Sequence, residues 1–226
     1  MAAPPTPQRS ADPLGHLPDV VPIFPLTGAL LLPGGELPLN IFEPRYLAMV
    51  DWALGHGRWL AMVQPRDTGE QTVADAHPVF ATACLGRITR FSESGDGRYL
   101  ITLAGHIRFR IADELPLEGG FRRVRPDYGA FGDDLDEIEL GSGERRQLFD
   151  ALKTYFQRMS FDADWQALEQ TPDRALVAAM AMACPFEPAE KQALLEARGL
   201  AARARALTAI LEMAGGGDAP DPARRH

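Results

Sequence analysis

The sequence predicts an α+β protein in which a β-rich first part is followed by a helical second part. Short apolar runs bounded by proline and glycine dominate residues 19–131. Apolar residues at helical spacing dominate residues 145–213. An acidic, glycine-containing stretch, residues 132–144, separates the two and is interpreted as a link. The length of 226 residues suits one large domain or two small ones packed together.

The first part contains a series of short β segments. The expected segments are Val20–Phe24, Ala29–Leu32, Leu37–Phe42, Trp59–Val63, Phe80–Phe91, Tyr99–Leu103, Ile107–Ile111 and Arg122–Arg125. Residues 94–97, Ser-Gly-Asp-Gly, predict a hairpin. Residues 104–106, Ala-Gly-His, predict a second tight turn, so both Gly97 and Gly105 are expected at positive φ. The apolar residues Phe24, Leu39, Ile41 and Phe42 are expected in the core of this part.

A helix is expected to begin at Pro44, because proline suits the first helical position and apolar residues then recur at helical intervals. Gly55-His56-Gly57 provides its stop. Glu43 lies where a carboxylate can cap the first amides of the helix. Arg45 is close enough along the chain to pair with Glu43 or Glu36, and sequence alone does not choose between them.

The second part is expected to form a small bundle of helical hairpins. One of its helices is expected to open at Pro188 and to run to Gly199. The inward faces are defined by Leu148, Leu152, Tyr155, Phe156, Met159, Leu176, Val177, Met180, Leu194, Leu195, Leu200, Leu207, Ile210 and Leu211.

Several segments and groups are expected to play no part in the core or in chemistry. Residues 1–18 are predicted to be a disordered leader, residues 214–226 a disordered tail, and residues 64–78 a polar mobile loop. Neither a secretion signal nor a long apolar run is recognised, so a cytoplasmic protein without a membrane segment is expected. Cys84 and Cys184 are expected to be buried reduced thiols, and the sequence does not show whether either has a redox role.

The inventory of reactive residues does not indicate an enzyme. Neither Lys153 nor Lys191 follows a glycine, which excludes a phosphate-binding P-loop. The histidines are scattered, no serine lies in a Gly-x-Ser-x-Gly turn, and the acidic run 133–139 is expected to be a solvated surface. We therefore expect no catalytic residue, cofactor or metal ion; a hydrolase of unrecognised type has no nucleophile–base pair or metal set to support it.

The stretch from Val21 to Tyr46 resembles the start of the Lon N-terminal, or substrate-binding, domain. Its ordered series of prolines and apolar residues ends in Ile-Phe-Glu-Pro-Arg-Tyr at 41–46, which is the specific part of the match. The resemblance continues at 86–88, 96–99, 105–111, 190–196 and 203–207, and so covers about residues 19–213.

The resemblance implies a PUA-like β-barrel with one or two helices, followed by a C-terminal helical bundle. It also implies a stand-alone bacterial member that lacks the ATPase and Ser–Lys peptidase modules and is not catalytic. Its partners would be unfolded or degron-bearing polypeptides, bound by apolar surface near the junction of barrel and bundle. Leu32, Pro33, Met49 and Trp52 are the candidate contacts. An adaptor role toward a separate protease or chaperone, and self-association, follow as extensions.

The alternative is an RNA-binding protein, because PUA-like barrels elsewhere recognise RNA. An exposed arginine stripe across adjacent strands would carry this function. Its members would be Arg108, Arg110, Arg122, Arg123 and Arg125, with Phe109 or Phe121 nearby. The net charge of −8 argues against this alternative and against binding to an anionic membrane.

Overall fold

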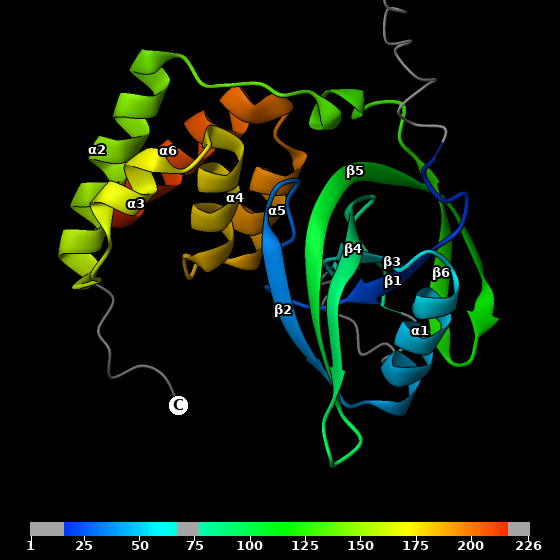
Figure 1. The fold of residues 1–226 in the computed structure, drawn as a ribbon. Coiled ribbons are helices and arrows are strands. Elements are labelled where there is room, and N and C mark those ends of the chain that lie inside the picture. The colour runs from blue at the N-terminus through cyan, green and yellow to red at the C-terminus, as the bar shows by residue number, and fades with distance from the viewer. Residues whose placement is uncertain (1–15, 67–76, 217–226) are drawn as a thin grey trace, which may run out of the picture.

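The computed structural model describes residues 16–66 and 77–216, and Figure 1 shows their arrangement. The strands are β1 (Val21–Pro25), β2 (Glu36–Ile41), β3 (Trp59–Val63), β4 (Thr82–Glu93), β5 (Tyr99–Glu118) and β6 (Phe121–Asp127). The helices are α1 (Pro44–Gly55), the 3₁₀ helix η1 (Gly132–Leu135), α2 (Ser142–Met159), α3 (Trp165–Gln170), α4 (Asp173–Ala183), α5 (Pro188–Glu196) and α6 (Gly199–Gly216). The expectation of an α+β fold, with strands first and helices second, is confirmed.

The strands form one mixed sheet in the order β2-β5-β4-β3-β1-β6. The pair β1–β3 is parallel and the other pairs are antiparallel. The 20-residue strand β5 pairs with β2 and β4 through its first half and with β6 through its second half. Pairing therefore leads from β5 through β4, β3, β1 and β6 back to β5. The apolar side chains enclosed by these strands include Val21, Ile23, Leu85, Ile107 and Phe109.

The tight turn expected at residues 104–106 does not form, because β5 continues through it. Gly97 has the expected positive φ of 78°, but Gly105 is not at positive φ. A Cβ atom at Gly105 would instead lie 2.0 Å from the carbonyl oxygen of Leu32. The Gly105 amide donates to the Gly35 carbonyl at 2.8 Å, and the Gly105 carbonyl accepts from the Gly34 amide at 3.0 Å. Glycine is needed here for close backbone approach and not for a turn.

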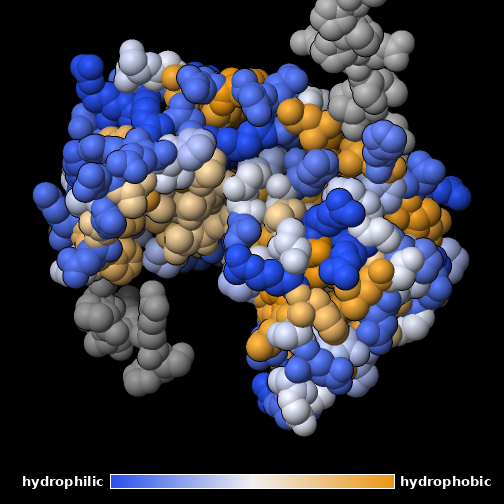
Figure 2. All heavy atoms as spheres, viewed as in Figure 1, coloured by the Kyte–Doolittle hydropathy of each residue, from blue (hydrophilic) through white to orange (hydrophobic). Residues whose placement is uncertain are grey.

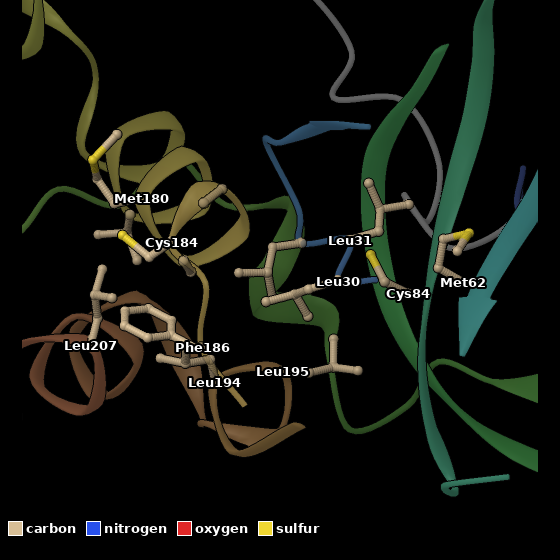
Figure 3. Packing of buried hydrophobic residues seen from close by; sticks show 14 of the residues in the cluster. Leu30, Leu31, Met62, Cys84, Met180, Cys184, Phe186, Leu194, Leu195 and Leu207 are labelled. Atoms are coloured by element: carbon tan, nitrogen blue, oxygen red, sulfur yellow. The ribbon is translucent and has the colours of Figure 1, made fainter. Parts of the chain in front are cut away.

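The apolar run Ala29–Leu32 forms no strand and instead fills the junction between the sheet and the helices. Leu30, Leu31 and Leu32 are buried in a hydrophobic cluster that is continuous from the strands into α2, α4, α5 and α6. Figure 3 shows Leu30 and Leu31 between side chains of the strands, such as Cys84, and side chains of the helices, such as Leu194. The two parts of the chain therefore share one core.

Helix α1 begins at Pro44, as predicted, but its expected carboxylate cap is absent. Glu43 occupies the N-cap position, yet its side chain caps no amide. Its carboxylate accepts a hydrogen bond from Arg45 Nε at 3.0 Å and lies 2.9 Å from Arg45 Nη2. Of the two partners that the sequence allowed for Arg45, the structure selects Glu43.

The helical part differs from the expectation in three details. Helix α5 has Pro188 in its first turn but ends at Glu196, and α6 begins at Gly199, where the expected single helix would have ended. Helix α2 begins at Ser142, inside the expected link, and the short α3 was not anticipated. Residues 1–15 of the expected leader, 67–76 of the expected loop and 217–226 of the expected tail lie outside the described residues.

Candidate functional site

A hollow of about 380 Å³ lies where the ends of β1 and β2 meet the start of α1. Apolar side chains from all three elements dominate its lining, and polar groups stand around them. The lining residues are Phe24, Pro25, Leu26, Thr27, Leu39, Asn40, Ile41, Phe42, Glu43, Arg45, Tyr46, Pro65, His77 and Arg122. We call this hollow the groove.

The local sequence explains why large apolar side chains reach solvent at the groove. Inward and outward positions alternate along β2, so that Ile41 is buried and Phe42, the next residue, points outward with 59% of its surface exposed. Pro44 then starts α1 and fixes the turn. Leu26, one residue beyond β1, is 37% exposed. Phe42 was expected in the core, and the period-two alternation is the signal that corrects this expectation.

The rings of Phe24 and Tyr46 form the wall of the groove, with centroids 4.4 Å apart. Partial burial raises the pKa of the Tyr46 hydroxyl, an effect that the neighbouring Arg45 opposes. The hydroxyl is therefore uncharged at neutral pH. An uncharged aromatic wall suits contact with another apolar or aromatic side chain.

The two arginines that line the groove are each paired with a carboxylate. Arg45 contacts Glu43 as described above. Arg122 donates to Glu114 through Nε at 2.6 Å and through Nη2 at 2.7 Å, and its Nη1 donates to the His77 carbonyl at 2.9 Å. Because neither guanidinium is left without a carboxylate, the groove favours apolar side chains over an anionic ligand.

A second hollow, of about 570 Å³, lies along β2, β4 and β5. It is lined by Pro38, Leu39, Asn40, Arg90, Phe91, Ser92, Leu100, Ile101 and Thr102. Leu100 is 49% exposed, and Leu39 and Asn40 line both hollows. We call it the strand hollow. Figure 2 shows apolar residues reaching the surface of the sheet part in this view, interrupted by polar ones.

The structure does not place the predicted peptide contacts Leu32, Pro33, Met49 and Trp52 on one apolar surface. Leu32 and Pro33 are buried at the junction, and Met49 lies on the buried face of α1. Trp52 is half-buried and stacks on His56, with ring centroids 3.9 Å apart. Burial of the first three corrects the expectation that they offer contact surface, because the apolar face of α1 is used to cover the sheet.

Arg108, predicted as part of an exposed arginine stripe, is fully buried. It donates to Asp134 through Nε and Nη2, each at 2.7 Å, and to the carbonyls of Leu195 and Ala197 at 3.0 and 2.6 Å. Asp134 is itself buried, although the acidic run was expected to be solvated. This cluster fastens η1 and the end of α5 to β5.

Arg203 is the second guanidinium of this cluster. It is buried, its Nε donates to the Leu194 carbonyl at 3.0 Å, and its Nη2 lies 3.9 Å from Asp134. Burial lowers the pKa of Arg203 to about 10, and the nearby Arg108 contributes in the same direction. The cluster thus concentrates two guanidiniums around one carboxylate in the junction.

The other four arginines of the predicted stripe differ in exposure and in pairing. Arg110 and Arg125 are exposed, whereas Arg122 and Arg123 are partly buried. Arg122 is paired with Glu114, and Arg123 is paired with Glu118. With Arg108 in the core, the five arginines do not form one exposed stripe.

Reactive groups are few in the described part of the chain. Within residues 16–66 and 77–216, no cluster of three or more His, Cys, Asp or Glu side chains is placed to hold a metal ion. Burial raises the pKa of the Cys84 thiol and raises that of Cys184 to about 11, which disfavours the reactive thiolate. Among the same residues, no helix combines the length and apolar character needed to cross a membrane.

Comparison with known proteins gives a consistent match. The family model for the ATP-dependent protease La (LON) substrate-binding domain matches residues 20–213. Lon protease 2 of Myxococcus xanthus is 28% identical over 111 residues, which are 49% of this chain and 13% of that protein. Lon protease 2 of Thermus thermophilus is 26% identical over 201 residues, which are 87% of this chain and 24% of that protein. The chain thus spans a quarter or less of the length of these relatives.

Two solved structures share the fold. A Lon N-terminal domain protein from Xanthomonas campestris aligns with a TM-score of 0.59 and 22% identity, covering 84% of this chain and 97% of that one. The N-terminal domain of the Mycobacterium avium complex Lon protease aligns with a TM-score of 0.60 and 19% identity, covering 85% and 98%. Together with the match over residues 20–213, the fold places this chain in the family of Lon substrate-binding domains.

Proposed function

We propose that the chain is a polypeptide-recognition module that holds apolar segments of unfolded or degron-bearing chains in the groove. The observation that carries the proposal is the groove itself, in which Phe42 and Leu26 are exposed beside the Phe24–Tyr46 wall. An exposed apolar surface rimmed by polar residues is typical of a protein-binding site. Membership of a family named for substrate binding supports the same function.

The size of the groove limits how much binding energy it can supply. A hollow of about 380 Å³ accommodates one or two large side chains. Burying one large apolar side chain contributes about 1.5–3 kcal/mol. Because a single anchor gives weak affinity, we expect short dwell times and tolerance of many sequences, which suits recognition of unfolded chains. The paired charges of the groove predict that this binding tolerates salt.

The finer role that we propose is that of a non-catalytic adaptor that presents bound polypeptides to a separate protease or chaperone. The support is the family: its name refers to the substrate-binding domain of an ATP-dependent protease. Self-association through the helical part is compatible with this role and would multiply weak grooves on one particle.

The test is a peptide array probed with the purified protein at low and at high salt, followed by titrations with the best fluorescent peptide. We expect salt-tolerant binding to apolar, aromatic-containing peptides. Phe42→Ser should weaken it roughly tenfold, as loss of an interface anchor does. Leu117→Ser is the matched control, because Leu117 is 54% exposed on β5 and does not line the groove.

The outcomes separate the alternatives. Equal losses for Phe42→Ser and Leu117→Ser would contradict the placement of the site in the groove. Absence of any peptide binding would contradict the proposal as a whole. Retention on RNA that disappears at high salt, without peptide binding, would favour the arginine-based alternative.

A further inference from the structure

Strand β2 has one unpaired edge. It pairs with β5 along one side, and among the described strands none pairs with its other side. The edge spans Glu36–Ile41 and is short, with Pro38 in its middle. Both features are ways in which proteins protect sheet edges against uncontrolled pairing.

The register of β2 on β5 shows which backbone groups point to the free edge. The Gly105 amide donates to the Gly35 carbonyl, and these residues flank the pair Glu36–Ala104. Such a bond marks Glu36–Ala104 as a pair without direct hydrogen bonds, and alternation extends this to Pro38 and Asn40. The backbone groups of Glu36, Pro38 and Asn40 therefore point away from β5. Proline at such a position removes no bond to β5, which agrees with the presence of Pro38.

One end of this edge is covered by the helical part. Gly34 packs against Arg174 and Gly35 against Met182, so closely that a Cβ atom on either glycine would collide with them. Beyond Glu36 the exposed residues Pro38 and Asn40 stand clear of these contacts. In Figure 1, β2 is the strand that lies beside α4 and α5 at one end and extends away from them at the other.

The open part of the edge lies between the two hollows. Leu39 and Asn40 line both the groove and the strand hollow. A strand placed beside β2 would direct successive side chains to opposite faces of the sheet. Side chains on the face of Leu39 would then be directed toward the Phe24–Tyr46 wall of the groove, and those between them toward Leu100 of the strand hollow, which pairs with Asn40 and shares its face.

We propose that the polypeptide binds by strand addition: an extended, uncharged segment pairs with the outward backbone groups of β2 while its alternate apolar side chains enter the two hollows. The inference rests on the proposed function and adds its mode of binding. Main-chain hydrogen bonds supply affinity that depends little on sequence, and the hollows select apolar residues at alternate positions. The occupant is thus a β-forming segment without proline at its bonding positions.

The decisive experiment is a backbone N-methyl scan of a short fluorescent peptide in which phenylalanine or valine alternates with threonine. N-methylation removes one amide donor and leaves the side chain unchanged. Strand addition predicts strong losses, roughly tenfold, at every second residue and small losses between them, because only every second amide faces β2. Losses without this period of two, or none, would overturn the inference.

Variants of β2 test the same pairing from the protein side. Asn40→Pro removes an outward amide and is expected to weaken binding, whereas Asn40→Ala keeps the amide and is the matched control. Pro38→Ala adds an outward amide and is expected to tighten binding roughly two- to tenfold, the worth of one hydrogen bond. Weaker or unchanged binding for Pro38→Ala would contradict the pairing without depending on whether Asn40→Pro folds.

Failure of the inference is distinguishable from failure of the proposed function. Peptide binding that is sensitive to Phe42→Ser but indifferent to N-methylation would keep the groove and reject strand addition. Absence of binding by the unmodified peptide would reject both the groove and strand addition.

Discussion

The junction and the groove are built from similar residue types used in opposite ways. At the junction, Arg108 is buried and surrounded by Asp134 and two carbonyls, and Leu30, Leu31 and Leu32 pack into the shared core. At the groove, Arg45 and Arg122 pair with carboxylates near the surface, and Phe42 stands exposed. The junction encloses its charged groups within the core, whereas the groove leaves apolar side chains exposed.

This difference indicates where a partner can bind. The family resemblance suggested the meeting of the strands and the helices as the binding surface, but there the chain seals its own core. The groove lies where the ends of β1 and β2 meet the start of α1, and there apolar side chains are left exposed. We therefore expect substitutions at the junction to change stability and substitutions at the groove to change binding.

The largest expected effect is that of Asp134→Ala at the junction. The variant leaves Arg108 and Arg203 buried without their carboxylate, which should lower the free energy of unfolding by about 3–5 kcal/mol. Chemical denaturation followed by circular dichroism measures this loss. A loss below about 1 kcal/mol would show that the ion pair does not hold the junction.

The control at the groove is Glu114→Ala, which removes the carboxylate partner of Arg122 at a partly exposed site. Its cost should stay within about 1 kcal/mol. The Asp134→Ala variant, under conditions where it remains folded, should bind peptide with the same affinity as the unmodified protein. A fall in that affinity would show that the two regions are energetically coupled and would break the comparison.

A smaller loss of stability is expected for Gly105→Ala. The added methyl group would meet the Leu32 carbonyl, which belongs to the backbone and cannot rotate away. We expect a loss of about 1–3 kcal/mol, as for overpacked cores, with peptide binding retained. Gly95→Ala is the control, because no atom lies within 4 Å of a Cβ atom there. Equal stability of the two variants would contradict a close approach at Gly105.

Elements bounded by clear turn residues were predictable from the sequence. Trp59–Val63 was predicted with the bounds of β3, and the hairpin at 94–97 joins β4 and β5. Gly105 was misassigned because the sequence shows only that glycine is present. Whether glycine serves a turn or a close contact depends on Leu32, a residue distant in the chain.

The site was less predictable because it depends on which surfaces other elements cover. The alternation from Ile107 to Ile111 correctly points Arg108 away from the enclosed apolar residues, but η1 and the end of α5 cover it there. Met49 was predicted as an exposed peptide contact, because the sequence does not show that the sheet lies beneath this position of α1. Phe42 emerges only from the end of β2, one residue beyond its last inward position.

The smallest expected effect is a pH dependence at His106, which follows Gly105 on β5. Partial burial lowers the pKa of its imidazole, and the nearby Arg87 contributes in the same direction. The folded state disfavours the protonated ring. The stability that the neutral imidazole contributes is therefore complete above its ordinary pKa of about 6.5, and it is lost as the pH falls toward the lower pKa of the folded state. His106→Gln should therefore show a smaller fall in melting temperature than the unmodified protein between about pH 7.5 and about pH 5.5.

The imidazole has two neighbours that matter here. The Trp59 ring lies 5.3 Å from the His106 ring, centroid to centroid, and the positive charge of Arg87 acts on the imidazole electrostatically. Arg87→Gln should remove only the smaller part of the effect, since burial is the larger cause. His106 does not line the groove, so His106→Gln should leave peptide affinity unchanged at each pH. An acid-induced loss of peptide affinity that disappears in His106→Gln would mean that protonation of His106 changes binding at the groove. Residues outside the groove would then affect binding as well as stability.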